Sequence, residues 1–369
     1  MSEPIRILNL FTNMNRGGAE TMVMNYYRNI DRTKVQFDFM VHRDQRGDYD
    51  DEIESLGGRI YRMCPVYPQN IVRYQKMLKD FFNEHNEYRI IHSHMSELGY
   101  FAFKEAHKHD IPVRICHAHN APVGFDSKII FRDILKNLIK PYTTHKFICS
   151  EPAGEWLFGK KNKNEFVQMN NAVDASLFRY DESTRKEVRR ELGVNDSTAV
   201  IGHVGRFNSQ KNHKFLIEIF KEINRINADS VLVLTGSGNL EDKIRNQVKE
   251  MDLEGKVIFT GVRSDVNRLL QGFDVFLFPS LFEGLSVILI ETQASGTPCL
   301  TSTAVSRQTE ISDVIDFYPL EESPANWAKK ALELSNRDKK DTFNQIADSG
   351  YDIKTNAQWL ESFYLENNK

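Results

Sequence analysis

Short apolar runs alternate along the chain with longer stretches in which apolar residues recur every three or four positions. In the first half, the short runs predict strands at residues 5–11, 35–41, 59–61, 89–92, 113–117 and 146–150. The longer stretches predict helices at residues 19–30, 50–56 and 71–85. Strands that alternate with helices predict an α/β fold, in which a parallel sheet carries helices on both faces.

The alternation pauses at residues 170–196, which contain a charged run and no strand pattern, and then restarts. Strands are predicted at residues 199–204, 230–235, 256–260 and 275–279, and helices at residues 214–226, 240–251, 289–295 and 355–366. One sheet on each side of a pause predicts two domains, at residues 1–174 and 175–350.

Composition and charge narrow the function classes. The chain has 369 residues, of which 40% are apolar and 27% charged, as in an ordinary folded protein. The 48 basic and 51 acidic residues give a net charge of −3, which argues against a dedicated nucleic-acid binder. The four cysteines are far apart and form neither a zinc motif nor a disulfide framework. With no signal-peptide pattern and no membrane-spanning apolar run, we expect a cytoplasmic protein.

Glycines follow the first predicted strand. Gly17 and Gly18 lie in a loop that leads into a helix. Glycines at such a turn let the backbone approach a ligand and aim N–H groups at an anion, although a plain tight turn would also explain them. Their spacing is not the G-x-G-x-x-G of a dinucleotide site.

Two cations follow the first strand of the second domain. Arg206 comes directly after the strand, and Lys211 stands five residues later, near a helix start. Two cations and a helix N-terminus can hold a diphosphate without a metal, whereas two exposed cations are the simpler interpretation. The loops at Gly236 and at Val262 and Arg263 follow the next two strands, so we expect them at the same edge of the sheet.

Two glutamates lie around the start of a predicted helix. Glu283 is in a glycine-containing loop, and Glu291 lies about a turn into the helix, within an apolar segment. Carboxylates in such a pair can accept hydrogen bonds from sugar hydroxyls. Two solvated glutamates are the alternative, which the apolar surroundings of Glu291 disfavour because a buried carboxylate needs a partner.

Taken together, these segments resemble the retaining glycosyltransferases of family 4, and most of the chain is covered. The motifs are Arg16-Gly17-Gly18-Ala19-Glu20, Gly205-Arg206-Phe207 with Lys211, Gly236-x-Gly238, Pro279-Ser280-x-x-Glu283-Gly284 with Glu291, and Gly296-x-Pro298. Within the family, the chain looks most similar to enzymes that build bacterial exopolysaccharide and capsule repeat units.

The resemblance implies a GT-B fold, an α/β architecture of two Rossmann-like domains that face each other across a cleft. A C-terminal helix, residues 351–369, is then expected to cross back to the first domain. The implied co-substrate is a nucleotide sugar, with UDP expected from its frequency in the family, and neither a resident cofactor nor a metal is expected. The implied acceptor is a glycan or a polyprenyl-diphosphate-linked sugar.

Each candidate residue takes a role from the resemblance. Arg206 and Lys211 would hold the donor diphosphate and stabilise the charge that develops as nucleoside diphosphate leaves. Glu291 would hold the ribose hydroxyls, and Glu283 the hydroxyls of the transferred sugar. The other donor-binding positions are Gly284, Leu285 and Ser286 at the phosphate and sugar, Val262 and Arg263 at the base, and Gly17, Gly18 and Gly236 in the glycine-bearing loops.

His119 stands where the family places a histidine beside the donor sugar, and it completes the catalytic set with Glu283, Arg206 and Lys211. It would bond a sugar hydroxyl or support an oxocarbenium-like transition state; His117 is the neighbouring alternative, and a purely structural histidine the simpler one. At the domain joint, Asn170-Asn171-Ala172-Val173-Asp174 replaces the family's Asn-Gly-hydrophobic-Asp, and an asparagine in the left-handed region would preserve the turn.

A further helix is predicted over residues 128–140. Its basic residues recur at every fourth position, at Lys128, Arg132, Lys136 and Lys140, and they flank an apolar face. This pattern is typical of a helix that lies on an anionic bilayer, which would place the protein peripherally on the inner face of the membrane. A helix packed on its own domain, with a solvated basic edge, is the alternative.

Two other functions share the architecture. A UDP-sugar 2-epimerase would need a general base near C2 of the sugar and would act without an acceptor. A non-catalytic nucleotide-sugar-binding subunit would bind the donor without turnover. The presence of Arg206, Lys211 and Glu283 argues against a catalytically inactive site.

Overall fold

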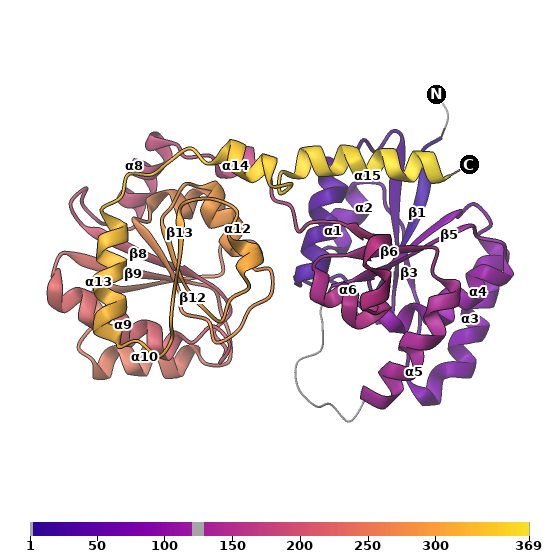
Figure 1. Cartoon of the computed structure of the whole chain (residues 1–369), viewed down its shortest axis with the longest axis horizontal. Coiled ribbons are helices and arrows are strands. Elements are labelled where there is room, and N and C mark those ends of the chain that lie inside the picture. Colours follow the sequence, from indigo (N-terminus) through magenta and orange to yellow (C-terminus); the bar gives the residue numbers. More distant parts are fainter. Residues whose placement is uncertain (1–2, 120–128, 369) are drawn as a thin grey trace. The chain divides into compact units, whose positions relative to one another are not determined.

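The computed structural model describes residues 3–119 and 129–368, and in it the chain forms two units, each built on its own parallel sheet (Figure 1). Unit 1 comprises Met1–Ala172 and Ile353–Lys369, and unit 2 comprises Val173–Asp352. Both crossings of the chain between the units lie within two residues of the domain boundaries expected from the sequence.

Unit 1 has a seven-stranded sheet in the order β3-β2-β1-β4-β5-β6-β7, and all neighbouring strands are parallel. Its strands are β1 (Ile5–Phe11), β2 (Val35–Val41), β3 (Ile60–Arg62), β4 (Ile90–Ser93), β5 (Val113–Ala118), β6 (His145–Ile148) and β7 (Phe166–Gln168). Its helices are α1 (Gly18–Asn29), α2 (Asp50–Ser55), α3 (Ile71–Glu84), α4 (Tyr100–Lys108), α5 (Ile129–Ile139), α6 (Glu151–Phe158) and α15 (Ile353–Asn367).

Helices cover both faces of this sheet because successive strand residues point to opposite sides. In β1, Ile7 packs with α1 and α15, whereas Leu8 packs with α3 and α4 on the other face. Helix α15 lies beside α1, and Leu360 and Tyr364 bury its inner side (Figure 1). The C-terminal helix is therefore part of unit 1.

Unit 2 has a six-stranded parallel sheet in the order β10-β9-β8-β11-β12-β13. Its strands are β8 (Ala199–Val204), β9 (Ser230–Thr235), β10 (Val257–Gly261), β11 (Val275–Phe278), β12 (Cys299–Ser302) and β13 (Ile315–Tyr318). Its helices are α7 (Ala175–Phe178), α8 (Glu182–Glu191), α9 (His213–Ile226), α10 (Glu241–Glu250), α11 (Val266–Leu269), α12 (Val287–Ala294), α13 (Pro324–Ser335) and α14 (Phe343–Asp348).

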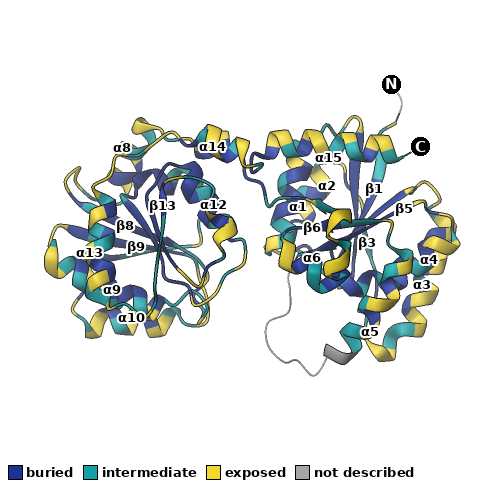
Figure 2. Cartoon of the chain, in the orientation of Figure 1, coloured by how far each residue is buried: buried dark blue, intermediate teal, exposed yellow. Residues whose placement is uncertain are grey.

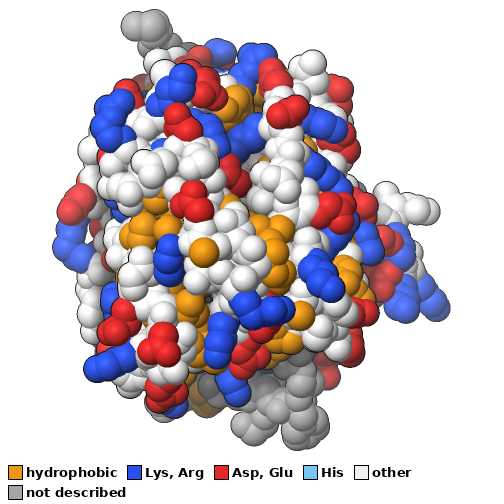
Figure 3. Space-filling view, turned by 90° about the vertical axis from the view of Figure 1, so that its left-hand side faces the viewer, with side chains coloured by type: hydrophobic (Ala, Val, Ile, Leu, Met, Phe, Trp, Pro, Cys, Tyr) orange, Lys and Arg blue, Asp and Glu red, His pale blue; other side chains and the backbone are white. Residues whose placement is uncertain are grey.

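The sheet of unit 2 separates two apolar layers. Ile201 packs toward α9, α10 and α13, and Val200 packs toward the layer that contains α8 and α12. The strands are buried and the outer sides of the helices are exposed (Figure 2). On the face of unit 2 seen in Figure 3, acidic and basic side chains are interspersed. Because the strands are parallel, the loops after β8, β9, β10 and β11 all leave one edge of the sheet.

The structure differs from the sequence prediction in several elements. The short strands β7, β12 and β13 and the helices α4, α6 and α13 were not predicted, and the charged run before β8 forms helix α8. At the joint, neither Asn170 nor Asn171 has a positive φ, so the expected left-handed asparagine is wrong. Within residues 3–119 and 129–368, no helix has the length and apolarity to cross a membrane.

Candidate donor site

Two loops of unit 2 meet through an ion pair. Lys211 lies in the loop between β8 and α9, and its Nζ is 2.7 Å from Oε1 of Glu283, in the loop between β11 and α12. The two side chains are only 15% and 12% exposed, and the ammonium also lies 4.4 Å from the ring centroid of Phe278. Two residues predicted independently for phosphate and sugar thus lie in direct contact.

Backbone and side-chain hydrogen bonds hold these loops together on both sides of the ion pair. The amide of Leu281 donates to the carbonyl of Gln210 at 2.8 Å, and the Gln210 side chain donates to the carbonyl of Phe282 at 3.1 Å. Asn212 adopts a left-handed φ of 55° at the start of α9, and its side-chain Nδ2 donates to the carbonyl of Pro279 at 3.1 Å. The position of Lys211 is therefore fixed by loop contacts as well as by the charge of Glu283.

Arg206 is placed differently from Lys211. Its side chain is exposed, and among the described residues no carboxylate lies within ion-pair distance of it. It leaves the carboxyl end of β8, at the same edge of the sheet as Lys211. Arg206 therefore presents an uncompensated positive charge at this edge.

The glycines of this edge are needed for close backbone contact. Gly236 has a φ of +132°, and a Cβ there would lie 2.2 Å from the carbonyl oxygen of Gly205. A Cβ on Gly238 would lie 2.4 Å from the carbonyl oxygen of Phe207. These glycines let the loop after β9 pack directly on the loop after β8, which explains their presence before any ligand is considered.

Helix α12 carries the second glutamate. Glu291 is partly buried, and burial raises the pKa of its carboxyl to about 7. Ser286 precedes the helix as its N-cap, but its hydroxyl makes no capping hydrogen bond. Gly284, in the same loop, has open space where a Cβ would be, and Leu285 is half-buried. The amide groups at the start of α12 and the Glu291 carboxyl are available to a polar ligand.

The remaining predicted donor-binding residues lie in the loop after β10 of unit 2 and at the start of α1 of unit 1. Arg263 makes a bidentate pair with Asp265 at 2.7 and 2.6 Å, so its charge is compensated within unit 2, while Val262 beside it is 66% exposed. In unit 1, Gly17 is the N-cap of α1 and Gly18 its first residue. A Cβ on Gly18 would meet no atom within 4 Å, so packing does not require that glycine.

His119, the histidine predicted to contact the donor sugar, belongs to a larger cluster of histidines in unit 1. His119 is partly buried, whereas His117 is fully buried, so only His119 reaches the surface. Both nitrogens of His119 are engaged: Nδ1 lies 3.2 Å from Sγ of Cys149, and Nε2 lies 2.9 Å from Nδ1 of His94. The predicted hydrogen bond from His119 to a sugar would require one of these contacts to be given up.

The partners of His119 were not predicted. His92 lies in β4 and His94 follows it, and His117 lies in the neighbouring strand β5 and His119 follows it, so two H-x-H segments lie side by side. Repeated H-x-H at the ends of predicted strands was the available signal. Two groups in this cluster bring ligand atoms within 4.8 Å of one another, namely His92, His94 and His117, and His117, His119 and Cys149.

Helix α5 uses much of its predicted basic flank within unit 1. Arg132 pairs with the buried Glu97 and lies 5.2 Å from the ring of Trp156, and Lys136 pairs with Asp133 at 2.7 Å. Lys140 donates to Asn137 at 2.9 Å, and Lys128 lies outside the described residues. Of the predicted apolar face, Leu135 and Ile139 are buried in the core, while Ile134 and Leu138 are exposed.

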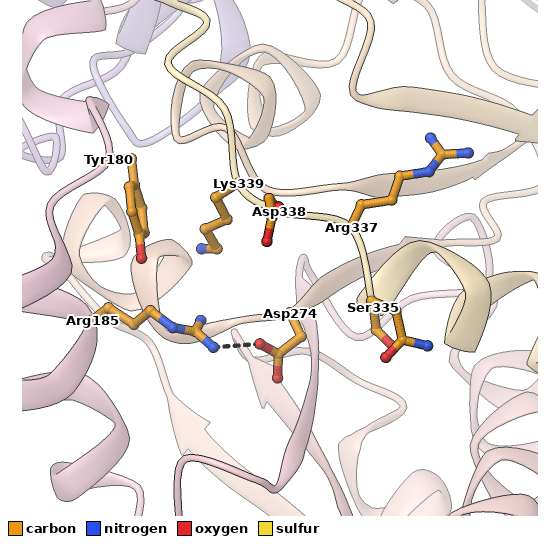
Figure 4. A pocket seen from close by; sticks show the side chains of 8 residues that line it. Tyr180, Arg185, Asp274, Ser335, Arg337, Asp338 and Lys339 are labelled. Carbon is orange, nitrogen blue, oxygen red and sulfur yellow. Dashed lines mark hydrogen bonds and ion pairs between the residues drawn. The ribbon is translucent and has the colours of Figure 1, made fainter.

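A polar cavity of about 380 Å³ lies at the opposite edge of the unit 2 sheet, beside the start of β11 (Figure 4). It is lined by Tyr180, Arg185, Asp274, Ser335, Asn336, Arg337, Asp338 and Lys339. Arg185 pairs with Asp274, and Lys339 donates to Leu270, Gln271 and Thr297 at 2.8–3.0 Å. Because an ammonium has three protons, all the donor capacity of Lys339 is already used to hold these segments together.

Comparison with known proteins identifies the chain. A family model described as glycosyl transferases group 1 matches residues 184–341. EpsF of Bacillus subtilis (strain 168), named as a glycosyltransferase, is 34% identical over 372 residues, which cover 97% of this chain and 96% of EpsF. The chain belongs to the group 1 glycosyltransferases.

Two other relatives of this glycosyltransferase carry more specific names. An Escherichia coli UDP-Gal:alpha-D-GlcNAc-diphosphoundecaprenol alpha-1,3-galactosyltransferase is 24% identical and covers 81% of this chain and 79% of its own. The Staphylococcus aureus capsular polysaccharide biosynthesis glycosyltransferase CapH is 25% identical and covers 98% and 99%.

Solved structures support the fold. Anabaena Alr3699/HepE in complex with UDP superposes with a TM-score of 0.79 at 19% identity, covering 98% of this chain and all of that one, and HepE has also been solved with UDP-glucose. The predicted fold class, a GT-B fold with two Rossmann-like parallel-sheet domains, is confirmed.

Proposed function

We propose that this glycosyltransferase is a retaining, metal-independent enzyme of family 4. It moves a hexose or N-acetylhexosamine from a UDP-sugar to a glycan or polyprenyl-diphosphate-linked acceptor in bacterial surface polysaccharide synthesis. The names of the E. coli and S. aureus relatives, and the UDP and UDP-glucose bound to HepE, support the donor, the acceptor and the pathway class.

The contact between Lys211 and Glu283 is the observation that carries the proposal. An ammonium held at 2.7 Å from a carboxylate can exchange that partner for a donor phosphate. The exchange frees Glu283 to accept hydrogen bonds from sugar hydroxyls. Arg206, exposed at the same edge, supplies the second charge that neutralises the leaving nucleoside diphosphate.

The remaining roles follow from position on the unit 2 sheet. Glu291 accepts hydrogen bonds from the ribose hydroxyls, and the backbone amides at the start of α12 donate to the phosphate or the sugar. Val262 contacts the base from the loop after β10. The role of His119 at the transferred sugar comes from the resemblance to family 4 and not from the unit 2 sheet. Retention arises when the acceptor attacks the face that the leaving group departs from, so no protein nucleophile is required.

Thermal stabilisation by nucleotides tests the donor assignment. UDP and UDP-sugars should raise the melting temperature in the presence of EDTA, and GDP and ADP should not, because a ligand stabilises the state that binds it. Lys211→Ala and Arg206→Ala should abolish the shift. Lys214→Ala, which removes an exposed lysine on α9, should keep it. A folded protein that no nucleotide stabilises would contradict the proposal.

Product analysis tests the reaction. Transfer from UDP-sugar to a polyprenyl-diphosphate sugar should give a product with the donor's anomeric configuration, as read from the proton coupling at the anomeric carbon. Inversion would refute the retaining mechanism. Isomerisation of the UDP-sugar without acceptor would support the 2-epimerase, and tight donor binding without turnover, with or without partner chains, would support a non-catalytic subunit.

We further propose that α5 brings the enzyme to anionic lipid, since Ile134 and Leu138 leave apolar surface exposed on one side of its buried residues Leu135 and Ile139, and Lys136 and Lys140 lie on the other side. Sedimentation with vesicles that contain phosphatidylglycerol should fall in an Ile134→Ser, Leu138→Ser variant. Equal sedimentation with neutral phosphatidylcholine vesicles would argue against an electrostatic contribution.

A further inference from the structure

Four histidines and one cysteine form a continuous chain of hydrogen bonds inside unit 1. From one end, Tyr364 Oη contacts His92 Nδ1 at 2.7 Å, and His92 Nε2 contacts His117 Nδ1 at 3.2 Å. His117 Nε2 then contacts Cys149 Sγ at 3.2 Å. Beyond Cys149, the chain runs through His119 and His94 to the side chain of Asn9.

The orientation of Asn9 fixes the direction of every proton in this chain. Its amide nitrogen faces the carbonyl oxygens of Ile7 and Asp38 at 3.3 and 3.5 Å, so its Oδ1 is the atom that faces Nε2 of His94 at 3.4 Å. An amide oxygen only accepts hydrogen bonds. Nε2 of His94 must therefore carry the proton, and Nδ1 of His94 must be the acceptor.

The same reasoning passes from ring to ring, because a neutral imidazole carries one proton. His119 donates to His94 through Nε2, which leaves Nδ1 of His119 to accept the thiol proton of Cys149 at 3.2 Å. Sδ of Met22 lies 3.7 Å from the same sulfur, but a thioether is the weaker acceptor for that proton. The sulfur then accepts from Nε2 of His117, whose Nδ1 accepts from Nε2 of His92. Nδ1 of His92 accepts the hydroxyl proton of Tyr364, and each ring nitrogen of the four histidines has a partner.

Burial keeps the rings in the neutral form that this order requires. Asn9, His92, His94 and His117 are at least nine-tenths buried, and desolvation lowers the pKa of the three imidazoles well below the usual value. The pKa of His119 is lowered to about 4 by the same cause. A second proton on His94 or His117 would place two N–H groups against each other, and on His119 or His92 it would face the Cys149 thiol or the Tyr364 hydroxyl, each of which is already the donor. The hydrogen-bonded chain and the burial therefore favour the same state.

We propose that Asn9, His94 and Cys149 are positioning residues that hold His119 as a neutral Nε2–H tautomer with both nitrogens turned inward. His119 then meets the sugar through its partly exposed ring as an uncharged group, and it is neither a proton donor nor a general base in turnover. Only the role at the sugar rests on the proposed function, since the proton order stands on the contacts within unit 1.

A metal ion is the competing use of the same atoms. Nε2 of His117, Nδ1 of His119 and Sγ of Cys149 lie close enough to share one ion. An ion there would need an unprotonated Nε2 on His117, which would move the proton of that ring to Nδ1. The tautomer of His117 therefore separates the two interpretations, and the hydrogen-bonded chain requires Nε2–H.

Long-range proton–nitrogen correlation of the full-length protein labelled with ¹⁵N-histidine tests the proton order without any activity. All four rings should show the Nε2–H pattern from about pH 6 to about pH 8. Asn9→Leu removes the acceptor and should release the tautomer of His94. Tyr364→Phe is the matched change at the other end, and it should leave His94 and His119 as they are. An Nδ1–H pattern on His119, or on His117 with a sulfur-to-metal absorption band after addition of Co²⁺, would overturn the proposal.

Cys149 variants test the link to catalysis. Cys149→Ala removes the hydrogen bond to Nδ1 of His119 and should lower kcat about tenfold with little change in KM for the donor, the size of one lost buried hydrogen bond. Cys149→Ser keeps an O–H and should restore most of kcat. The Nδ1 resonance of His119 should move to the value of an unbonded nitrogen in Cys149→Ala only. Unchanged resonances would overturn the positioning role, whereas an intact tautomer pattern in a protein without transferase activity would refute only the proposed function.

Discussion

Replacing Glu291 by glutamine should stabilise unit 2 at alkaline pH while weakening nucleotide binding. Burial raises the pKa of this carboxyl to about 7, against 4.5 for the free group. The charged form is therefore disfavoured in the folded state, and the folded protein binds the proton more tightly than the unfolded chain. Stability from this group is fully present below about pH 4.5 and is lost as the pH rises through about 7. A glutamine has no charge to bury, so the variant escapes this loss.

The magnitude follows from the shift. The rise of the pKa from 4.5 to about 7, at about 1.4 kcal/mol per pKa unit, gives an upper limit of about 3–4 kcal/mol. Between about pH 5 and about pH 8 the wild type should lose roughly 2–3 kcal/mol of stability relative to Glu291→Gln. For a unit of this size, that difference corresponds to about 5–10 °C in melting temperature.

Tryptophan fluorescence can isolate unit 2 for this measurement. The chain has three tryptophans, and only Trp327 lies in unit 2, where it is fully buried. A background with Trp156→Phe and Trp359→Phe leaves Trp327 as the sole reporter. The melting temperatures of wild type and Glu291→Gln are then compared across the pH range, with and without UDP.

Two results would refute the reasoning. A difference in melting temperature that does not change between about pH 5 and pH 8 would show that the Glu291 carboxyl is not held against its charge. A UDP-induced shift that is equal in both proteins would remove Glu291 from the donor site. Glu250→Gln, which changes an exposed glutamate on α10, is the matched control and should show no comparable pH dependence.

Two further predictions concern packing. Gly236→Ala should destabilise unit 2 by about 2 kcal/mol or more, because its Cβ would lie 2.2 Å from the carbonyl oxygen of Gly205, and UDP should no longer stabilise the protein. Gly284→Ala has open space and should melt within about 2 °C of wild type, so equal losses in both variants would contradict the steric argument. Arg132→Met should destabilise unit 1 by about 1–3 kcal/mol in urea unfolding, because it leaves the buried Glu97 without its ion pair. An unchanged unfolding midpoint would show that this pair contributes nothing.

The elements that the sequence predicted well are those with long and regular patterns. The predicted bounds of β1, β2, β8 and β9 agree with the structure residue for residue, because each is a run of six or seven mostly apolar residues, as parallel strands covered on both faces require. The strands that were not predicted, β7, β12 and β13, are three or four residues long. Runs so short carry few positions, so their prediction is uneven: β4 and β11, also four residues long, were predicted, whereas β7, β12 and β13 were not.

In the candidate donor site, too, some features were predictable from the sequence and others were not. Local sequence placed Lys211 and Glu283 after separate strands, and parallel strands bring such loops to one edge, so their proximity was predictable. The ion-pair partners of Arg132 and Arg263 were not predicted from the sequence. Arg263 pairs with a residue two positions away, whereas Arg132 pairs with Glu97, 35 residues distant, and only packing selects that carboxylate.

The sequence by itself determined the α/β class, the two-domain division and the chemical types gathered at the end of each strand. Only the tertiary structure decided which of those groups are free to meet a ligand. Arg206 stays exposed, while both nitrogens of His119 turn toward His94 and Cys149. The physical reason is that an apolar pattern reports which side of an element is buried, whereas a hydrogen bond depends on angles and distances between side chains that only the packed fold brings together.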